Sequence, residues 1–235
     1  MIMSEKLLSS QFEAELAHAT ARMLEMGGLV ESQLRQCIYA LHHLSLETVQ
    51  QVLQQEALVN NFEVEIDYEI TSTMSRRQPT ARDLRLLVAL SRVVMNLERV
   101  GDKAARIAKL IRAHIQAGAP RALPSGDLES SLSYAIEQLH QTLDAFARLD
   151  AHAANTVINS DDRLDEDYAG YTRKLITYMM EDPRTIGSSL NLLFLAKAIE
   201  RVGDHAKNIA EATIYVVKGA DVRHASEEER KSALQ

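Results

Sequence analysis

Apolar residues recur at alternating spacings of three and four through most of this 235-residue chain, with polar residues between them. This spacing places the apolar side chains along one face of an α-helix and is typical of helices packed in bundles. Six stretches show the pattern, and each predicts a long helix, at about residues 12–44, 47–74, 80–111, 128–149, 164–178 and 184–218. We therefore predict an all-α protein.

The segment QAGAPRALPSGD, residues 116–127, interrupts this pattern near the middle of the chain. Its two glycines and two prolines cannot continue a helix. We expect two tandem, homologous three-helix bundles, with the first in residues 1–117, a linker in 118–127, the second in 128–220 and a charged C-terminal tail in 221–235.

The sequence ERVGD occurs at residues 98–102 and again at residues 200–204, at the same place in the last helix of each half. This repetition indicates an internal duplication. Glycine in a helix interior costs about 1 kcal/mol relative to alanine, so Gly101 and Gly203 require an explanation. Close approach of a neighbouring helix, or of a bound ion with its ligands, would each supply one.

Both copies of ERVGD carry a pair of acidic residues. Glu98 and Asp102 differ by only about 40° around the helix, so their carboxylates lie on one face, one turn apart. That face is roughly 130° to 170° from the apolar seam of the same helix. We predict surface carboxylates on the side farthest from the core, and the same geometry holds for Glu200 and Asp204.

The helix before each ERVGD copy offers a second set of oxygen ligands. Asp161 and Asp165 are four residues apart in the second half, and the corresponding residues of the first half are Glu56 and Asn60. Like charges at this spacing repel one another unless a cation lies between them. Magnesium, manganese and iron suit such oxygen ligands. A solvated acidic face is the alternative interpretation, and His205 is interpreted as a bystander.

Composition excludes several classes of protein. Hydrophobic residues make up 46% of the chain, and a net charge of -7 disfavours binding to nucleic acid or anionic lipid. The single cysteine, Cys37, cannot form an internal disulfide, and the first residues do not resemble a secretion signal, so we expect a cytoplasmic protein. No apolar run approaches the roughly 20 residues of a membrane span, which leaves peripheral association through partners.

Enzyme classes find little support. A di-iron carboxylate oxidase needs two ExxH motifs that face the core of a four-helix bundle. The chain contains Glu15 with His18 and Glu137 with His140, but both pairs lie beside the apolar seams of their helices. Cys37 lies in an apolar row and is interpreted as a core residue. We therefore predict that the chain is not an enzyme, with a di-iron enzyme as the alternative.

A metal-free helical scaffold is the other alternative. The turn between the second and third predicted helices is basic, with four arginines at positions 76, 77, 82 and 85. Such a patch could contact an acidic partner or phosphate, or could be only a solvated loop.

Several longer motifs make the chain similar to a known family. The segments MGGLVE, RRQPTARDLRL, LERVGDKA, LDAFARLDA, YMMEDPRTI, IERVGDHAKNIAE and YVVKG occur in the expected order. The chain thereby resembles the PhoU phosphate-transport regulators over nearly its whole length. The resemblance implies two similar three-helix bundles whose E/DxxxD motifs hold metal ions, including multinuclear iron, on the surface. The positions that match those motifs are Glu98, Asp102, Glu200, Asp204, Asp161, Asp165 and Glu56.

The resemblance also implies a function. PhoU proteins link a phosphate ABC transporter, through its ATPase subunit, to the membrane sensor histidine kinase of the phosphate two-component system. They repress the phosphate regulon and restrain phosphate uptake when phosphate is plentiful. They are cytoplasmic and commonly homodimeric. Iron, magnesium, manganese or zinc are the metals expected. Asn60 departs from the fully acidic pattern, which puts the ion count of its site in question.

Overall fold

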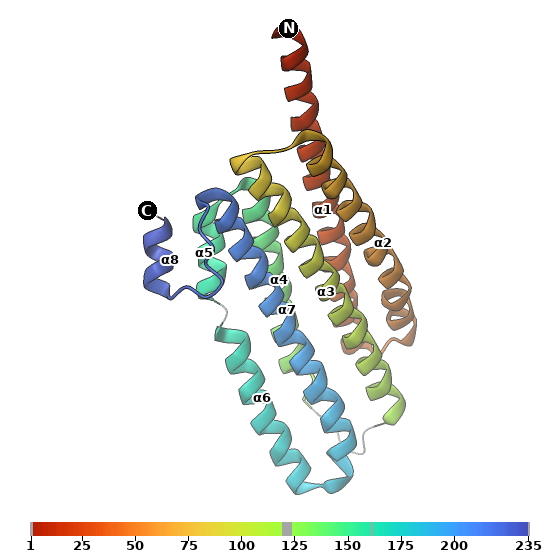
Figure 1. The fold of residues 1–235 in the computed structure, drawn as a ribbon. Helices are drawn as coiled ribbons and strands as arrows, with labels where there is room; N and C mark the ends of the chain where they lie inside the picture. Colours follow the sequence, from red (N-terminus) through yellow and green to blue (C-terminus); the bar gives the residue numbers. More distant parts are fainter. Residues whose placement is uncertain (1, 119–123, 161, 235) are drawn as a thin grey trace.

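The computed structural model describes residues 2–118, 124–160 and 162–234, with side chains from residue 10 onward. Every regular element in this part of the chain is a helix, which confirms the all-α prediction (Figure 1). The first half contains α1 (Ile2–His43), α2 (Leu46–Arg77) and α3 (Ala81–Ala117). The second half contains α4 (Gly126–Arg148), α5 (Ala151–Asn159), α6 (Asp162–Glu181), the short 3₁₀ helix η1 (Pro183–Thr185), α7 (Ile186–Lys218) and α8 (Glu227–Leu234).

Local hydrogen bonds explain where the helices begin. The Ser45 hydroxyl accepts a hydrogen bond from the Thr48 amide at 3.2 Å and caps α2. The Asp182 carboxylate accepts from the Arg184 amide at 3.0 Å and opens η1, as a cap of this residue type should. Thr80 occupies the cap position of α3, but its hydroxyl makes no capping hydrogen bond.

The two halves meet along α3 and α7, which lie side by side (Figure 1). His205 and Asn208 of α7 both donate to the side-chain oxygen of Asn96 on α3, at 3.0 and 3.2 Å. Farther along, the Arg92 guanidinium covers the ring of Tyr215 at 5.0 Å. Residue numbers fall on α3 as they rise on α7, so the two helices run antiparallel.

This antiparallel contact brings the two ERVGD segments together at its centre. Lys103 and His205 occupy equivalent positions in the repeat, and the charge of Lys103 is close enough to contribute to lowering the His205 pKa, although burial is the main cause. Val100 and Val202 are fully buried, and one continuous apolar core includes residues of both halves. The repeated motif therefore joins the two bundles.

Close packing of a neighbouring helix explains both motif glycines. A Cβ atom at Gly101 would lie 2.9 Å from Cγ1 of Val59 on α2, and one at Gly203 would overlap Cδ1 of Leu164 on α6. Atoms in a close-packed interior leave no room for such a group. Of the two explanations that the sequence left open, helix approach is the one that the structure supports.

The second half contains a short helix, α5, that the apolar spacing did not predict. Leu149 adopts a left-handed conformation with φ 52° and ends α4. The Asp150 carboxylate then accepts from the amides of His152 and Ala153, at 3.0 and 2.9 Å, and starts α5. Val157 of α5 is buried. Thus α5 and α6 together occupy the place that the single helix α2 holds in the first half.

The segment predicted as a charged tail folds back onto the second half. Its helix α8 contacts α5 and α7, and Val222 and Leu234 are buried there. Beneath this segment, Glu211 of α7 is only 7% exposed. Burial raises the Glu211 pKa to about 7, although Lys207 and Arg230 oppose the shift. None of the described helices is apolar enough over a sufficient length to cross a membrane.

Replacing Gly101 with alanine should destabilise the protein. The new methyl group would crowd Val59, and overpacking of a core costs about 1–3 kcal/mol, which exceeds the gain of about 1 kcal/mol in helix propensity. Gly28 is the matched control, because a Cβ there would meet no atom within 4 Å. Urea unfolding should show a loss for Gly101→Ala, a gain for Gly28→Ala and partial recovery in Val59→Ala/Gly101→Ala. Equal gains in the two alanine variants would contradict this account.

The buried Glu211 carboxyl should make stability depend on pH. The folded protein holds this proton up to about pH 7, whereas the unfolded chain releases it near the ordinary value of 4.5. The contribution to stability is therefore complete below about pH 4.5 and is lost as the pH rises through 7, by at most about 3 kcal/mol. Unfolding of wild type and Glu211→Gln, compared between pH 5 and 8, should show the extra loss only in wild type. If the stability of wild type and of Glu211→Gln changed in parallel with pH, Glu211 would not be the group responsible.

Candidate functional site

The acidic residues of the first ERVGD copy face α2 and lie near a further carboxylate. Burial raises the Glu98 pKa, and the negative charges of Asp102 and Glu63 raise it further. Glu63 of α2 responds in the same way, with burial as the main cause and Asp67 as the next. Arg99, whose Nε lies 3.6 Å from Glu98, offsets only part of this repulsion. These carboxyl groups are therefore near enough to repel one another, and their basic neighbours offset this repulsion only in part.

The α2 residue predicted for this site lies elsewhere along the helix. The Glu56 carboxylate is 3.7 Å from Nζ of Lys109 on α3, and Asn60 is exposed. Glu63 and Asp67 are the acidic side chains of α2 that act on the Glu98 group electrostatically, directly or through each other. They also have the spacing of an ExxxD motif, so the sequence contained this signal, although the α2 residues that align with Asp161 and Asp165 are Glu56 and Asn60.

Basic neighbours hold the acidic residues of the second ERVGD copy. Lys197 Nζ lies 2.6 Å from Oε1 of Glu200, and Arg201 Nη1 lies 2.9 Å from Oδ2 of Asp204. The other carboxylate oxygen of Glu200, Oε2, is buried and has no hydrogen-bond partner among the described residues. Burial raises the Glu200 pKa, and the hydrogen bond from Lys197 opposes the shift.

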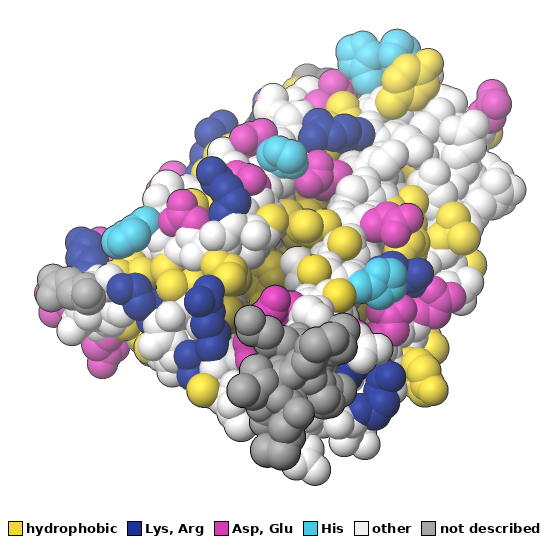
Figure 2. Space-filling model, turned by 90° about the horizontal axis from the view of Figure 1, so that it is seen from above, with side chains coloured by type: hydrophobic (Ala, Val, Ile, Leu, Met, Phe, Trp, Pro, Cys, Tyr) yellow, Lys and Arg dark blue, Asp and Glu magenta, His cyan; other side chains and the backbone are white. Residues whose placement is uncertain are grey.

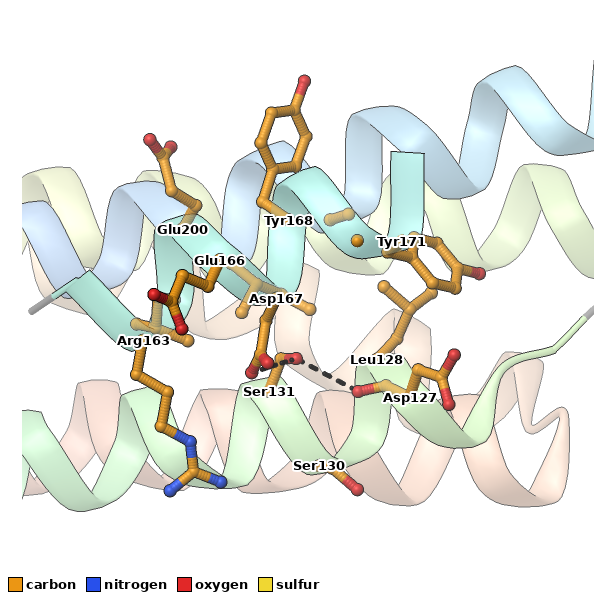
Figure 3. A pocket seen from close by; sticks show the side chains of 14 residues that line it. Asp127, Leu128, Ser130, Ser131, Arg163, Glu166, Asp167, Tyr168, Tyr171 and Glu200 are labelled. Carbon is orange, nitrogen blue, oxygen red and sulfur yellow. Dashed lines mark hydrogen bonds between the residues drawn. The ribbon is translucent and has the colours of Figure 1, made fainter. Parts of the chain in front are cut away.

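A cavity of about 360 Å³ lies beside Glu200, between α4, α6 and α7 (Figure 3). In this view Asp167 of α6 points toward Ser131 of α4, whose hydroxyl donates to it at 3.1 Å, whereas Glu200 points away from Ser131. The predicted Asp165 is exposed on α6. Asp161 lies outside the described residues.

The prediction of surface carboxylates is wrong for Glu200, which is buried, and Glu98 is only partly exposed. Glu200 is 8% exposed, and the side chain of Glu98 is 18% exposed. A helix with a single buried face would expose these carboxylates, but α3 and α7 each pack against several other helices. Their faces opposite the apolar seam are covered by α2 and α6, whose Val59 and Leu164 reach the motif glycines.

Carboxylate oxygens are suitable ligands for a hard cation, and each ERVGD copy supplies two of these side chains. A bound cation would satisfy the oxygen ligands, relieve their mutual repulsion and contact Oε2 of Glu200, which has no hydrogen bond and lies 3.8 Å from Arg201. Within the ranges 2–118, 124–160 and 162–234, no three His, Cys, Asp or Glu side chains surround one point. An ion at either pair would thus keep bound water as part of its shell or draw a further side chain toward it.

The two ExxH motifs and Cys37, which were candidates for enzyme chemistry, do not come together in one site. The side chains of His18 and His140 are 65% and 60% exposed, and Glu137 accepts from the neighbouring Gln141. These ExxH motifs face away from the core, as the sequence predicted. Cys37 is fully buried, and desolvation raises its pKa to about 12. A thiol with this pKa is no nucleophile near neutral pH.

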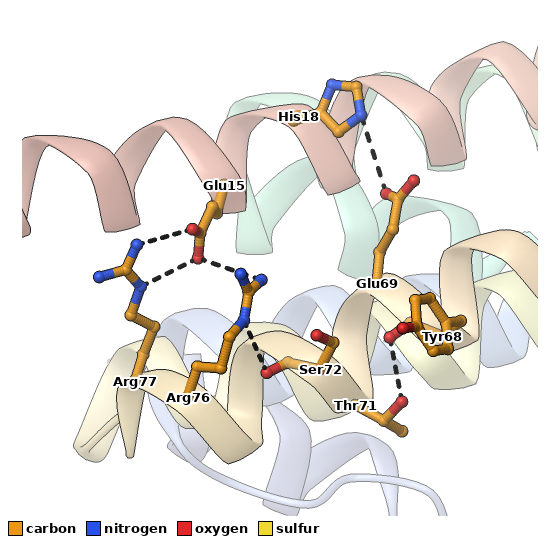
Figure 4. A network of polar contacts seen from close by, with 8 residues as sticks. All are labelled: Glu15, His18, Tyr68, Glu69, Thr71, Ser72, Arg76 and Arg77. Atoms are coloured by element: carbon orange, nitrogen blue, oxygen red, sulfur yellow. Dashed lines mark hydrogen bonds and ion pairs between the residues drawn. The ribbon is translucent and has the colours of Figure 1, made fainter.

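Two of the four arginines in the predicted basic patch contact an acidic side chain. Glu15 of α1 accepts two hydrogen bonds from Arg77, at 2.7 and 3.1 Å, and lies 3.9 Å from Arg76 (Figure 4). Arg85 packs beside Gly219 at the end of α7, and Arg82 is exposed. Figure 2 shows basic and acidic side chains interspersed over this end of the molecule. The turn is therefore not a continuous cationic surface.

Comparison with known proteins agrees with this duplicated architecture. The PhoU domain matches the chain twice, at residues 23–111 and 128–213. The phosphate-specific transport system accessory protein PhoU homologue of Burkholderia sp is 46% identical to this chain, and the match covers 97% of each protein. The accessory protein PhoU of Escherichia coli K12 is 42% identical over 97% of this chain and 94% of its own.

Solved structures share the fold. The crystal structure of PhoU from Pseudomonas aeruginosa is 40% identical and superposes with a TM-score of 0.85 over 89% of this chain and 100% of that one. PhoU from Streptococcus pneumoniae, at 24% identity, has the same fold, with a TM-score of 0.82 over 90% of this chain and 99% of that one. Domain match, near-full-length identity and fold together show that the chain belongs to the PhoU family.

Proposed function

We propose that this protein is an accessory regulator of a phosphate-specific transport system, one that represses the phosphate regulon and restrains phosphate uptake when phosphate is plentiful. The observation that carries the proposal is the near-full-length similarity to proteins named phosphate-specific transport system accessory protein PhoU. The two PhoU domain matches and the fold shared with the crystal structure of PhoU from Pseudomonas aeruginosa support it.

The regulator would act by contact in the cytoplasm, as a homodimeric adaptor between the ATPase subunit of the transporter and the sensor histidine kinase. Membrane association would occur through those partners alone. Several large apolar side chains are exposed and supply contact area, among them Val64 and Tyr68 on α2, Met180 on α6 and Phe194 on α7. Apolar and aromatic side chains of this kind are enriched at the centres of protein interfaces.

The acidic pairs would bind metal ions as part of this function. Glu98 and Asp102 would supply ligands in the first half, with Glu63 nearby, and Glu200 and Asp204 in the second. Glu56, Asp161 and Asp165 are the further ligands expected from the family pattern. Iron, magnesium, manganese and zinc are the candidates. Bound cations would neutralise carboxylates that otherwise repel one another between α3 and α2 and beside α7.

The regulatory role can be tested in the native host. Deleting the gene should raise expression from a phosphate-regulon promoter at high phosphate, because the kinase would lose its inhibitory partner. Re-expression of the chain should restore repression, and a tagged copy should recover the transporter ATPase subunit and the kinase from solubilised membranes. An unchanged reporter in the deletion strain would contradict the regulatory role, and recovery of neither protein would contradict the adaptor mechanism.

Metal binding is tested by replacing the four ERVGD carboxylates with isosteric amides. The variant Glu98→Gln/Asp102→Asn/Glu200→Gln/Asp204→Asn should lose most of the metal that wild type retains after dialysis, as measured by elemental analysis. It should also lose the rise in melting temperature on adding Mn²⁺, since an ion that binds only the folded state stabilises it.

A control variant keeps the same charge change but moves it to exposed carboxylates. Glu13→Gln/Glu25→Gln/Glu47→Gln/Glu228→Gln alters four exposed side chains away from both pairs. It should retain metal and the Mn²⁺ response. If the two variants held equal amounts of metal, the ERVGD carboxylates would not be the ligands.

A further inference from the structure

A second cavity, of about 470 Å³, lies between α3, α7 and the segment that follows α7. It contains none of the proposed metal ligands. Its volume falls within the range of roughly 300–1,000 Å³ that is usual for small-molecule sites. The polar side chains that define its chemistry come from three segments of the chain: Arg92, Arg99, Asn208, Glu211, Asp221 and Arg223.

Positive charge dominates one side of this cavity. Arg92 and Arg99 are seven residues apart on α3, so they share a helix face about 10 Å apart along the axis. The Arg92 guanidinium stacks on Tyr215 and has no ion pair among the described residues. Asp221 is already bound to Arg223, by contacts of 2.6 and 2.9 Å. Arg92 therefore remains without an ion pair among the described residues, whereas Arg99 contacts Glu98 at 3.6 Å and would have to share that contact with an anion.

The opposite side carries a buried group without a partner. Glu211 lines the cavity, is 7% exposed, and makes no hydrogen bond or ion pair within the described part of the chain. Its oxygens are not among the fully enclosed atoms that lack a partner, so they reach the cavity and are accessible to a ligand.

The remaining wall of the cavity is apolar. Met95, Ala212 and the ring of Tyr215, one face of which the Arg92 guanidinium covers, form it. An aromatic or other flat apolar group would pack against these side chains, whereas a bare inorganic anion would leave them uncovered. An organic ligand with an anionic group for the arginines, a polar group for Glu211 and an apolar ring for this wall would thus match the cavity.

We propose that this cavity binds the phosphoryl group of a small ligand between Arg92 and Arg99. Arginine is suited to phosphate because its planar guanidinium donates paired, charge-assisted hydrogen bonds. The ligand bridges α3 to α7 and the segment after it, so its binding couples the two bundles. A nucleoside monophosphate, which adds a ring for the Tyr215 wall and polar groups for Glu211, fills more of the site than free phosphate does.

Isothermal titration calorimetry with the full-length protein tests the proposal, using AMP, inorganic phosphate and adenosine as probes. AMP should bind more tightly than phosphate, and adenosine should bind weakest of the three. Equal affinity for AMP and phosphate would identify free phosphate as the ligand of the same arginine site. Failure of both AMP and phosphate to bind at about 10 mM would overturn the proposal.

Two arginine variants separate a built site from general charge attraction. Arg92→Ala should weaken AMP binding by about tenfold or more, because it removes charge-assisted hydrogen bonds. Arg112→Ala removes the same charge from an exposed position about 30 Å along α3 and should leave affinity unchanged. Equal losses in both variants would refute the site. Arg99 is left in place because it also contacts Glu98.

A variant of Glu211 gives an independent measurement. At pH 8 sulfate is a dianion, and Glu211 would share the cavity with it as a carboxylate, surrounded by Lys207, Asp221, Arg223 and Arg230. Glu211→Gln should therefore bind sulfate more tightly than wild type at this pH. Weaker binding would contradict an anion placed beside Glu211. Since no proposed metal ligand is altered, failure here would leave the metal and regulatory proposals untouched.

Discussion

The antiparallel contact of α3 with α7 is the constraint on which the rest of the molecule depends. The two helices carry the equivalent segments of an internal repeat, and they cross where Val100 and Val202 are fully buried. Because both helices are central, each must also accept a neighbour on its other side. The glycine of ERVGD allows this approach, since a methyl group at Gly101 would press on Val59. The glycine of the motif therefore has a structural role, which is to let a neighbouring helix pack closely.

Its acidic residues acquire their properties from the same packing. A helix that approaches a glycine closely also covers the side chains one turn away, so Glu98 and Glu200 are withdrawn from water. Removing a carboxylate from water raises its pKa, and a second carboxylate nearby raises it further. The free energy needed to keep these groups charged is recovered only with a cation, whether a lysine, an arginine or a metal ion. Packing and ion binding are thus linked through the single residue Gly101 or Gly203.

Long, regular features of the fold could be predicted from the sequence, and short or context-dependent ones could not. The seams of α3 and α7 run over many turns, so their periodicity identified them and the repeat. Helix α5 has nine residues, too few to show a period, and its start depends on the left-handed Leu149. Helix α8 buries little besides Leu234. The burial of Glu200 depends on α6, a neighbour that no angle measured within one helix reveals.

The two halves have diverged in how they balance this buried charge. Val59 and Leu164 contact equivalent glycines, so positions 105 apart correspond between α2 and α6, and Glu63 corresponds to Tyr168. In the last helices the interval is 102, and Met95 corresponds to Lys197.

The second half therefore has a lysine that binds Glu200 and stacks on Tyr168, where the first half has a methionine and another carboxylate. The first half thus lacks the lysine that contacts its motif glutamate and has one carboxylate more, while Lys103 stands where the second half has His205 and offsets part of that charge. Under the proposed metal binding, the extra carboxylate would make the first half the stronger site. In the second half a metal would first have to displace Lys197. Lys197 and Arg201 thus neutralise much of the charge of Glu200 and Asp204 within the chain. Glu98 and Asp102 keep more of their mutual repulsion, which a cation from solution would relieve.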